Sequence, residues 1–114
     1  MNIEDFDWGI TSEWYRKTIG KEFFEKNLYF KFFNVEENDI VLDLGASIGP
    51  FGYVIKDNNI KHLYSFEPST GLIPTLVKNT ESLPSTILPY AIGSENKMEI
   101  VNTSDVYHSE LSFI

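Results

Sequence analysis

Cysteine is absent from this chain of 114 residues. Its absence excludes disulfide bonds, thiolate metal sites and cysteine nucleophiles, and is compatible with any compartment. Long apolar runs are also missing, since none approaches the roughly 20 residues that cross a bilayer. Residues 1–7 carry acids where a signal peptide has bases and an apolar core. These absences predict a cytoplasmic protein.

Basic residues are scarce: Lys and Arg number 9 against 17 Asp and Glu, for a net charge of -8. A phosphate backbone or an anionic membrane surface would on average be repelled, so neither nucleic acid nor a membrane is a predicted partner. No set of His and carboxylate residues has the spacing of a metal site, so we predict none. A chain of 114 residues that is 42% hydrophobic and 15% aromatic is enough for one globular domain with a core but too little for two.

Residues 11–33 are dense in aromatic side chains, with Thr11 or Ser12 as a helix cap. We predict one helix here, or two that break near Gly20. One set falls near a helical period: Tyr15, Ile19, Phe23, Phe30 and Phe33. A second set points elsewhere: Trp14, Phe24, Leu28 and Phe32. The aromatic residues therefore either pack in the core or form the wall of a substrate pocket or a dimer contact.

Residues 38–51 have the pattern of a strand, a tight turn and a helix. The apolar run 40–44 resembles a parallel strand covered on both faces, with Asp43 as its one acid. Gly45 and Gly49 permit backbone angles that a Cβ would obstruct, and Pro50 suits a first helical position. This arrangement directs a helix N-terminus toward the carboxyl end of a strand, where α/β proteins commonly hold nucleotide-like ligands.

The remaining elements continue an alternating order of strands and helices. A short helix follows with a stripe of Phe51, Val54 and Ile55, and then a strand over 61–68. A helix capped by Ser69 or Thr70 carries an apolar side of Leu72, Leu76 and Leu83. A strand over 85–92 and a short strand over 97–101 complete the prediction. Right-handed crossovers make the first three strands parallel, as in the first half of a doubly wound sheet.

The glycine turn lacks the usual devices for a pyrophosphate. Ser47 and Pro50 stand where a G-x-G-x-x-G dinucleotide fingerprint has its second and third glycines, and no Lys-Ser or Lys-Thr pair follows the turn. The turn is better suited to an uncharged adenosyl group with an amino-acid tail. Glu67 ends the next strand, where its carboxylate can accept hydrogen bonds from both ribose hydroxyls. The alternative is that Asp43 only accepts turn N–H groups and that Glu67 is a solvated strand end.

Several segments together resemble the FkbM family of S-adenosylmethionine-dependent methyltransferases. They are V-L-D-L-G-A-S-I-G-P-F at 41–51, Y-S-F-E-P at 64–68, A-I-G at 91–93 and the polar lead-in N-V-E-E-N-D at 34–39. The similarity covers roughly residues 29–100. Most class I methyltransferases have a further glycine at the place of Ser47, whereas the FkbM pattern tolerates Asn or Ser there.

The resemblance implies a cofactor, S-adenosyl-L-methionine, and residues that bind it. Four residues of the turn would line its methionine and ribose portion: Gly45, Ala46, Ser47 and Gly49. By the same resemblance, Asp43 organises the loop and Glu67 holds the ribose. Tyr90 and Ala91 occupy the place where many class I enzymes carry an acid for adenine. The implied reaction is O-methylation of a hydroxyl on a sugar or another small metabolite.

The resemblance names no catalytic base. The candidates in the tail are Tyr107, His108 and Glu110, and an isolated histidine such as His108 is more often a surface residue.

The length bears on whether this chain is an enzyme at all. We divide it into an N-terminal helical segment, 1–34, and a partial Rossmann-like cofactor-binding domain, 35–114. The strands that lie on the other side of 41–44 in a class I fold are absent, which leaves an edge that invites pairing. Three interpretations follow: a fragment of a methyltransferase, a non-enzymatic half-domain that completes its sheet with a partner or second copy, or a compact enzyme whose pocket is closed by 97–114.

Overall fold

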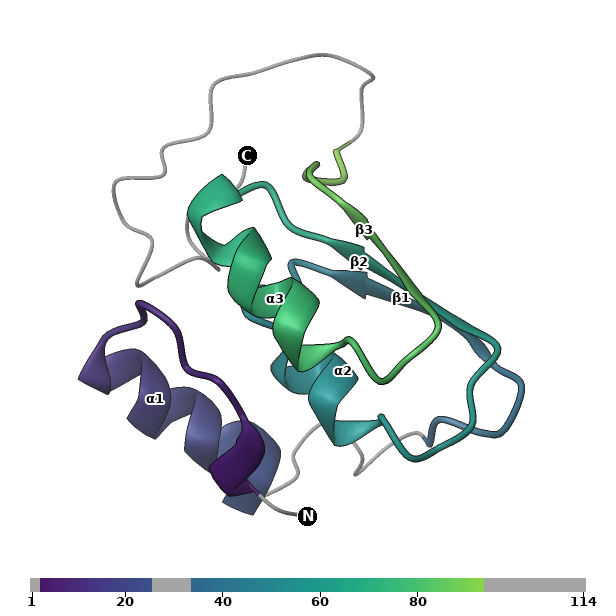
Figure 1. Ribbon diagram of the computed structural model, residues 1–114, viewed down its shortest axis with the longest axis horizontal. Helices are drawn as coiled ribbons and strands as arrows, with labels where there is room; N and C mark the ends of the chain where they lie inside the picture. Colours follow the sequence, from purple (N-terminus) through teal and green to yellow (C-terminus); the bar gives the residue numbers. More distant parts are fainter. Residues whose placement is uncertain (1–2, 26–33, 94–114) are drawn as a thin grey trace.

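The structure is a computed structural model that describes residues 3–25 and 34–93 (Figure 1). The helical elements are η1 (Ile3–Asp5), α1 (Glu13–Ile19), the π-helix η2 (Gly20–Glu25), α2 (Pro50–Val54), η4 (Thr70–Leu72) and α3 (Ile73–Asn79). The strands are β1 (Ile40–Leu44), β2 (His62–Phe66) and β3 (Ser85–Leu88). The predicted strand over 97–101 and the three candidate bases of the tail lie outside the described residues.

The three strands form one parallel sheet in the order β1-β2-β3, which confirms the predicted α/β arrangement. Asp43 is the register partner of Ser65, and Leu44 is the partner of Phe66. The strand ends of β1 and β2 are therefore level, and the turns that follow them lie side by side. This edge of the sheet carries the candidate site.

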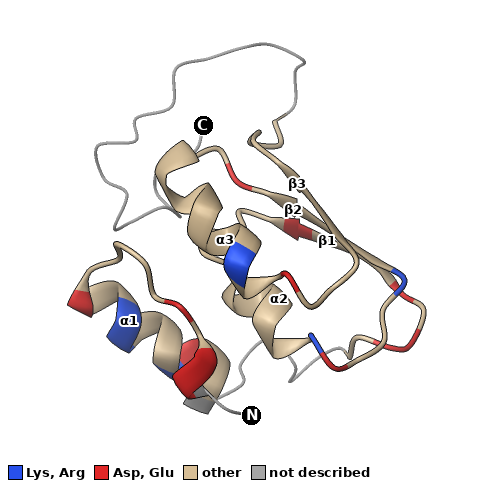
Figure 2. Cartoon of the chain, viewed as in Figure 1, with Lys and Arg blue, Asp and Glu red and all other residues tan. Residues whose placement is uncertain are grey.

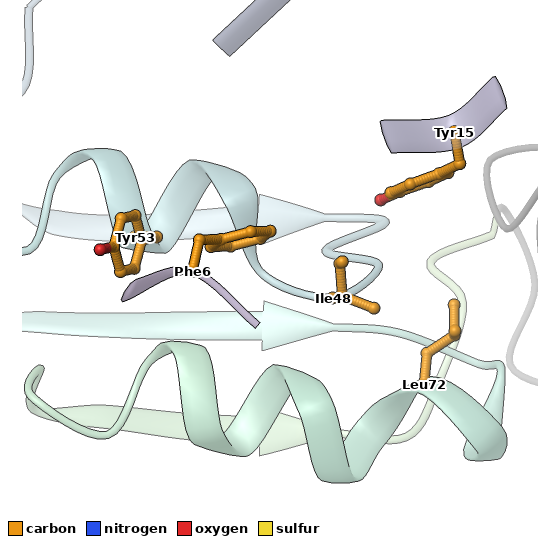
Figure 3. Packing of buried hydrophobic residues seen from close by; sticks show 5 residues of the cluster. All are labelled: Phe6, Tyr15, Ile48, Tyr53 and Leu72. Atoms are coloured by element: carbon orange, nitrogen blue, oxygen red, sulfur yellow. The ribbon is translucent and has the colours of Figure 1, made fainter. Parts of the chain in front are cut away.

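The prediction that β1 is covered on both faces is wrong. Ile40, Leu42 and Leu44 are 60%, 62% and 58% exposed, while Val41 on the other face packs against a buried cluster. The reason is topological, because two right-handed crossovers that advance in the same direction place both helices on one face. Figures 1 and 3 show α2 and α3 on that shared face. The opposite face of β1 has no cover among the described residues.

The helix α2 is buried from two sides. Between it and the sheet lies a cluster of Ile55, Ile60, Leu63 and Leu83, against which Phe51 packs. On its other side, Tyr53 belongs to a second cluster with Phe6, Tyr15, Ile48 and Leu72 (Figure 3). The predicted stripe of α2 included Ile55 and Phe51 but missed Tyr53, because that stripe described one buried face only. The N-terminal segment supplies the second.

The N-terminal helix does not break at Gly20. Ser12 caps α1 by accepting a hydrogen bond from the N–H of Tyr15 at 3.1 Å. Gly20 keeps right-handed helical angles, and the chain continues as the π-helix η2. Tyr15 and Phe23 are buried, as the first predicted set requires, whereas the later members of both sets lie outside the described residues.

Asn79, at the end of α3, ties the N-terminal segment to the rest of the fold. Its side-chain amide donates to the carbonyl oxygens of Asp7, at 2.7 Å, and Ile48, at 2.8 Å. Its Oδ1 accepts from the N–H of Asp7 at 2.9 Å. Asn79 is buried, so these three groups satisfy one another where water does not reach. Asp7 also forms an exposed ion pair with Lys78 at 2.9 Å.

We expect Asn79→Ala to lower the free energy of unfolding by about 2 kcal/mol, because it leaves buried backbone groups without partners. Urea denaturation followed by circular dichroism measures this change. Lys78→Ala is the matched control, since it removes the neighbouring contact to the same Asp7 but only a surface ion pair. Its denaturation midpoint should stay close to that of the wild type. Equal losses in the two variants would contradict the role assigned to Asn79.

Candidate functional site

The turn after β1 has the backbone geometry that its glycines predict. Gly45 and Gly49 have φ angles of 80° and 89°, and Ser47, between them, has a φ of 56°. The N–H groups of Gly45 and Ala46 both donate to the carbonyl oxygen of Phe66 at 2.9 Å, which joins the turn to the end of β2. Pro50 then begins α2, as predicted.

Two side chains hold Ser47 in its left-handed conformation. Its N–H donates to Glu67 Oε1 at 2.7 Å, and its hydroxyl forms a buried hydrogen bond with the hydroxyl of Tyr15. Figure 3 shows Tyr15 reaching from α1 toward the turn that carries Ile48. A non-glycine residue at positive φ is uncommon and persists where its surroundings constrain it. Ser47 is therefore the point where β2 and the N-terminal helix meet the turn.

Glu67 lies beside the first turn, as its position in the sequence predicts. It is 1% exposed, so the alternative of a solvated strand end is wrong. Its second oxygen, Oε2, accepts from the N–H of Ser69 at 2.9 Å. Glu67 thus joins the turns that follow β1 and β2 by hydrogen bonds to backbone N–H groups. Its role as a ribose ligand stays a prediction.

A cavity of about 440 Å³ opens between this turn and the N-terminal helix. One wall comes from the end of β1 and the turn: Asp43, Leu44, Gly45, Ala46, Ser47, Pro50 and Phe51. The other wall comes from α1 and η2: Trp14, Tyr15, Thr18, Ile19, Glu22 and Phe23. Tyr15 and Phe23 are buried and also line the cavity. The aromatic segment therefore both packs in the core and forms a cavity wall.

A second cavity, of about 120 Å³, adjoins the first. It is lined by Leu44, Gly45, Pro68, Ala91 and Ile92, from the ends of all three strands. Leu44 and Gly45 line both cavities. Ala91 lines this second cavity, whereas Tyr90 lines neither cavity and is 60% exposed.

The larger cavity favours a cationic group. Its lining residues include two acids, Glu22 and Asp43, and no Lys, Arg or His. The basic residues of the described chain lie on α1 and η2, after α2, before β2 and on α3, and none of them lines the cavity (Figure 2). Burial raises the pKa of Asp43 to about 7, and the nearby charge of Glu67 adds to the shift. The Oδ2 atom of Asp43 is buried and has no hydrogen-bond partner, and the task of Asp43 at the turn stays a prediction.

Sequence reasoning missed the wall that α1 and η2 supply, apart from its aromatic residues. Glu22 and Thr18 carry no motif, and they reach the cavity only because the N-terminal segment docks against α2 and η4. The density of aromatic residues in 11–33 was the available signal, because large apolar side chains often line ligand pockets.

The fold and site define an α/β protein with a parallel three-stranded sheet and a ligand-sized cavity at the carboxyl edge of β1. No protein-family model, curated protein or solved structure matches the chain. Within residues 3–25 and 34–93, no cluster of three His, Asp or Glu residues could hold a metal ion. No helix in this part of the chain is both long and apolar enough to cross a membrane.

Proposed function

We propose that this chain forms the cofactor-binding half of an S-adenosylmethionine-dependent methyltransferase that resembles the FkbM family. The observation that carries the proposal is the pair of cavities that both have Gly45 in their walls. The larger is acidic and partly aromatic, which suits a sulfonium with an amino-acid tail, because aromatic faces and carboxylates attract cations. The smaller is lined by apolar residues and suits a planar base.

The residues of the turn have defined tasks in this proposal. Gly45, Ala46 and Ser47 would contact the cofactor between the two cavities, with Asp43 near its cationic portion. Gly49 lets the chain pass α3 closely enough for α2 to begin behind the turn. Bound S-adenosylmethionine would supply a methyl group on a sulfonium: the acceptor hydroxyl oxygen would bond to the methyl carbon in line, the thioether S-adenosylhomocysteine would leave, and the hydroxyl proton would pass to solvent. We propose a sugar or another small metabolite as the acceptor, and a cytoplasmic location.

Calorimetry with S-adenosylmethionine tests this proposal. Gly45→Ala should weaken binding at least tenfold, about 1.4 kcal/mol, because it adds a methyl group at a residue that lines both cavities. No atom lies within 4 Å of the added Cβ, so the variant still folds. Gly20→Ala is the control, since its Cβ meets only Trp8, at 4.0 Å, and Gly20 lines neither cavity. Absence of saturable binding to the folded wild type would refute the proposal.

A second candidate function rests on the open face of β1. Ile40, Leu42 and Leu44 form an exposed apolar row on a strand that pairs only with β2 among the described strands. Such an edge favours pairing with another chain. We therefore also propose, as the alternative, a non-enzymatic half-domain that binds a nucleotide-like ligand and completes its sheet with a partner or a second copy. Sedimentation of the same samples separates a self-associating protein from a monomer.

A further inference from the structure

The larger cavity is lined by two acids, Glu22 and Asp43. The proposed function does not explain the surroundings of Asp43. Asp43 is half-buried and lines the cavity, while its Oδ2 is shielded from solvent and has no hydrogen-bond partner. Its register partner on β2, Ser65, also has a buried hydroxyl without a partner. A carboxylate in such a place lacks the donors that normally stabilise its charge.

The groups around Asp43 add negative charge. From the end of β2 comes Glu67, whose oxygens accept the N–H groups of Ser47 and Ser69. The wall formed by α1 and η2 contributes one further acid, Glu22, and the hydroxyl group of Tyr15. The lining residues of α2, Pro50 and Phe51, are uncharged. No described lining residue supplies a positive charge to pair with Asp43.

From this geometry we infer that a cationic ligand in the larger cavity expels the proton of Asp43, so that ligand binding and proton release are coupled at this one carboxyl group. In the free site the ionised form of Asp43 is disfavoured, because it would be buried beside Glu67. A cation in the cavity supplies the missing counter-charge and favours the carboxylate. The proton passes to solvent, and no other bond changes.

The coupling sets the pH dependence of ligand affinity. With the pKa of Asp43 at about 7 in the free protein, the ionised fraction rises from about one tenth to about nine tenths between about pH 6 and pH 8. A cation that needs the carboxylate should therefore bind up to about tenfold more tightly at the higher pH. An Asn at this position cannot ionise, so the corresponding variant should show no such change.

The inference rests on the proposed function for its probe, S-adenosylmethionine. Titration calorimetry at about pH 7 in buffers of different ionisation enthalpy counts the protons released. We expect about half a proton per ligand for the wild type, none for Asp43→Asn, and an unchanged value for Glu13→Gln, whose exposed acid on α1 lies outside the cavity. S-adenosylhomocysteine, which lacks the sulfonium charge, should release fewer protons.

The outcomes separate the two claims. Saturable binding of S-adenosylmethionine with the same proton release in the wild type and in Asp43→Asn would overturn the inference and leave the proposed function in place. A binding enthalpy of the wild type that is the same in every buffer would mean that no proton is released, and would also overturn the inference alone. Absence of binding by both compounds to the folded protein would overturn the proposed function, and the inference with it.

Discussion

Stability that falls as the pH rises from about 4 to 7 is the largest effect we expect, and it should depend on Asp43. The pKa of this carboxyl is raised from 3.8 to about 7 in the folded protein. The folded state therefore holds a proton that the unfolded state has already released. The contribution of this group to the free energy of unfolding is largest below its pKa in the unfolded state, and it is lost as the pH rises toward its pKa in the folded state.

The expected size follows from the width of that window. Each pKa unit corresponds to about 1.4 kcal/mol, so ionisation of Asp43 should lower the free energy of unfolding by about 4 kcal/mol across the window. Asp43→Asn removes the titrating group with little change of shape. The free energy of unfolding of Asp43→Asn minus that of the wild type should therefore increase by this amount between about pH 4 and pH 7.

Urea denaturation at several pH values measures the difference between the two proteins. Asp57→Asn is the control, because Asp57 is exposed in the turn after α2 and lines neither cavity. This variant should follow the wild type at every pH. Parallel pH profiles for Asp43→Asn and the wild type would show that Asp43 ionises as an ordinary surface acid, and would contradict its burial.

Replacement of Gly49 by alanine is expected to lower the free energy of unfolding by about 3 kcal/mol, from two separate causes. The φ of 89° strains any residue that has a Cβ. The added methyl group would also lie 3.0 Å from Leu76 Cδ1 and 3.3 Å from Thr80 Cγ2. Leu76 and Thr80 are buried, so neither can move aside cheaply.

Gly45→Ala separates the two causes. Gly45 has a similar φ, 80°, but no atom lies within 4 Å of its added Cβ. This variant should lose only the cost of strain, about 1 kcal/mol. Thermal or urea unfolding of both proteins under one condition gives the comparison. Equal losses would mean that α3 yields to the new methyl group and that Gly49 is needed for its backbone angle alone.

Gly45 and Gly49 thus have different roles in the same turn. Gly49 is where α3 approaches the start of α2, and Gly45 lines both cavities. The sequence shows only that both positions avoid a Cβ. Which of them faces a neighbour and which faces open space depends on the packing of α3, whose residues lie nearly 30 positions further along the chain.

The sequence by itself determined the strand, turn and helix of 40–54 and the parallel order of the sheet. These features depend on local causes: glycines where φ is positive, a proline at the helix start, and the handedness of strand–helix–strand units. The same causes place Glu67 beside the turn, because it ends the neighbouring strand.

Only the tertiary structure decided the open face of β1, the second wall of the larger cavity and the burial of Asp43. Each depends on contacts between distant residues, such as Tyr15 with Ser47 and Asp7 with Asn79. Hydrophobic spacing along one segment shows that a face is apolar but not which other segment covers it. The apolar run of β1 therefore predicted burial on both faces, whereas the crossovers of this fold cover one.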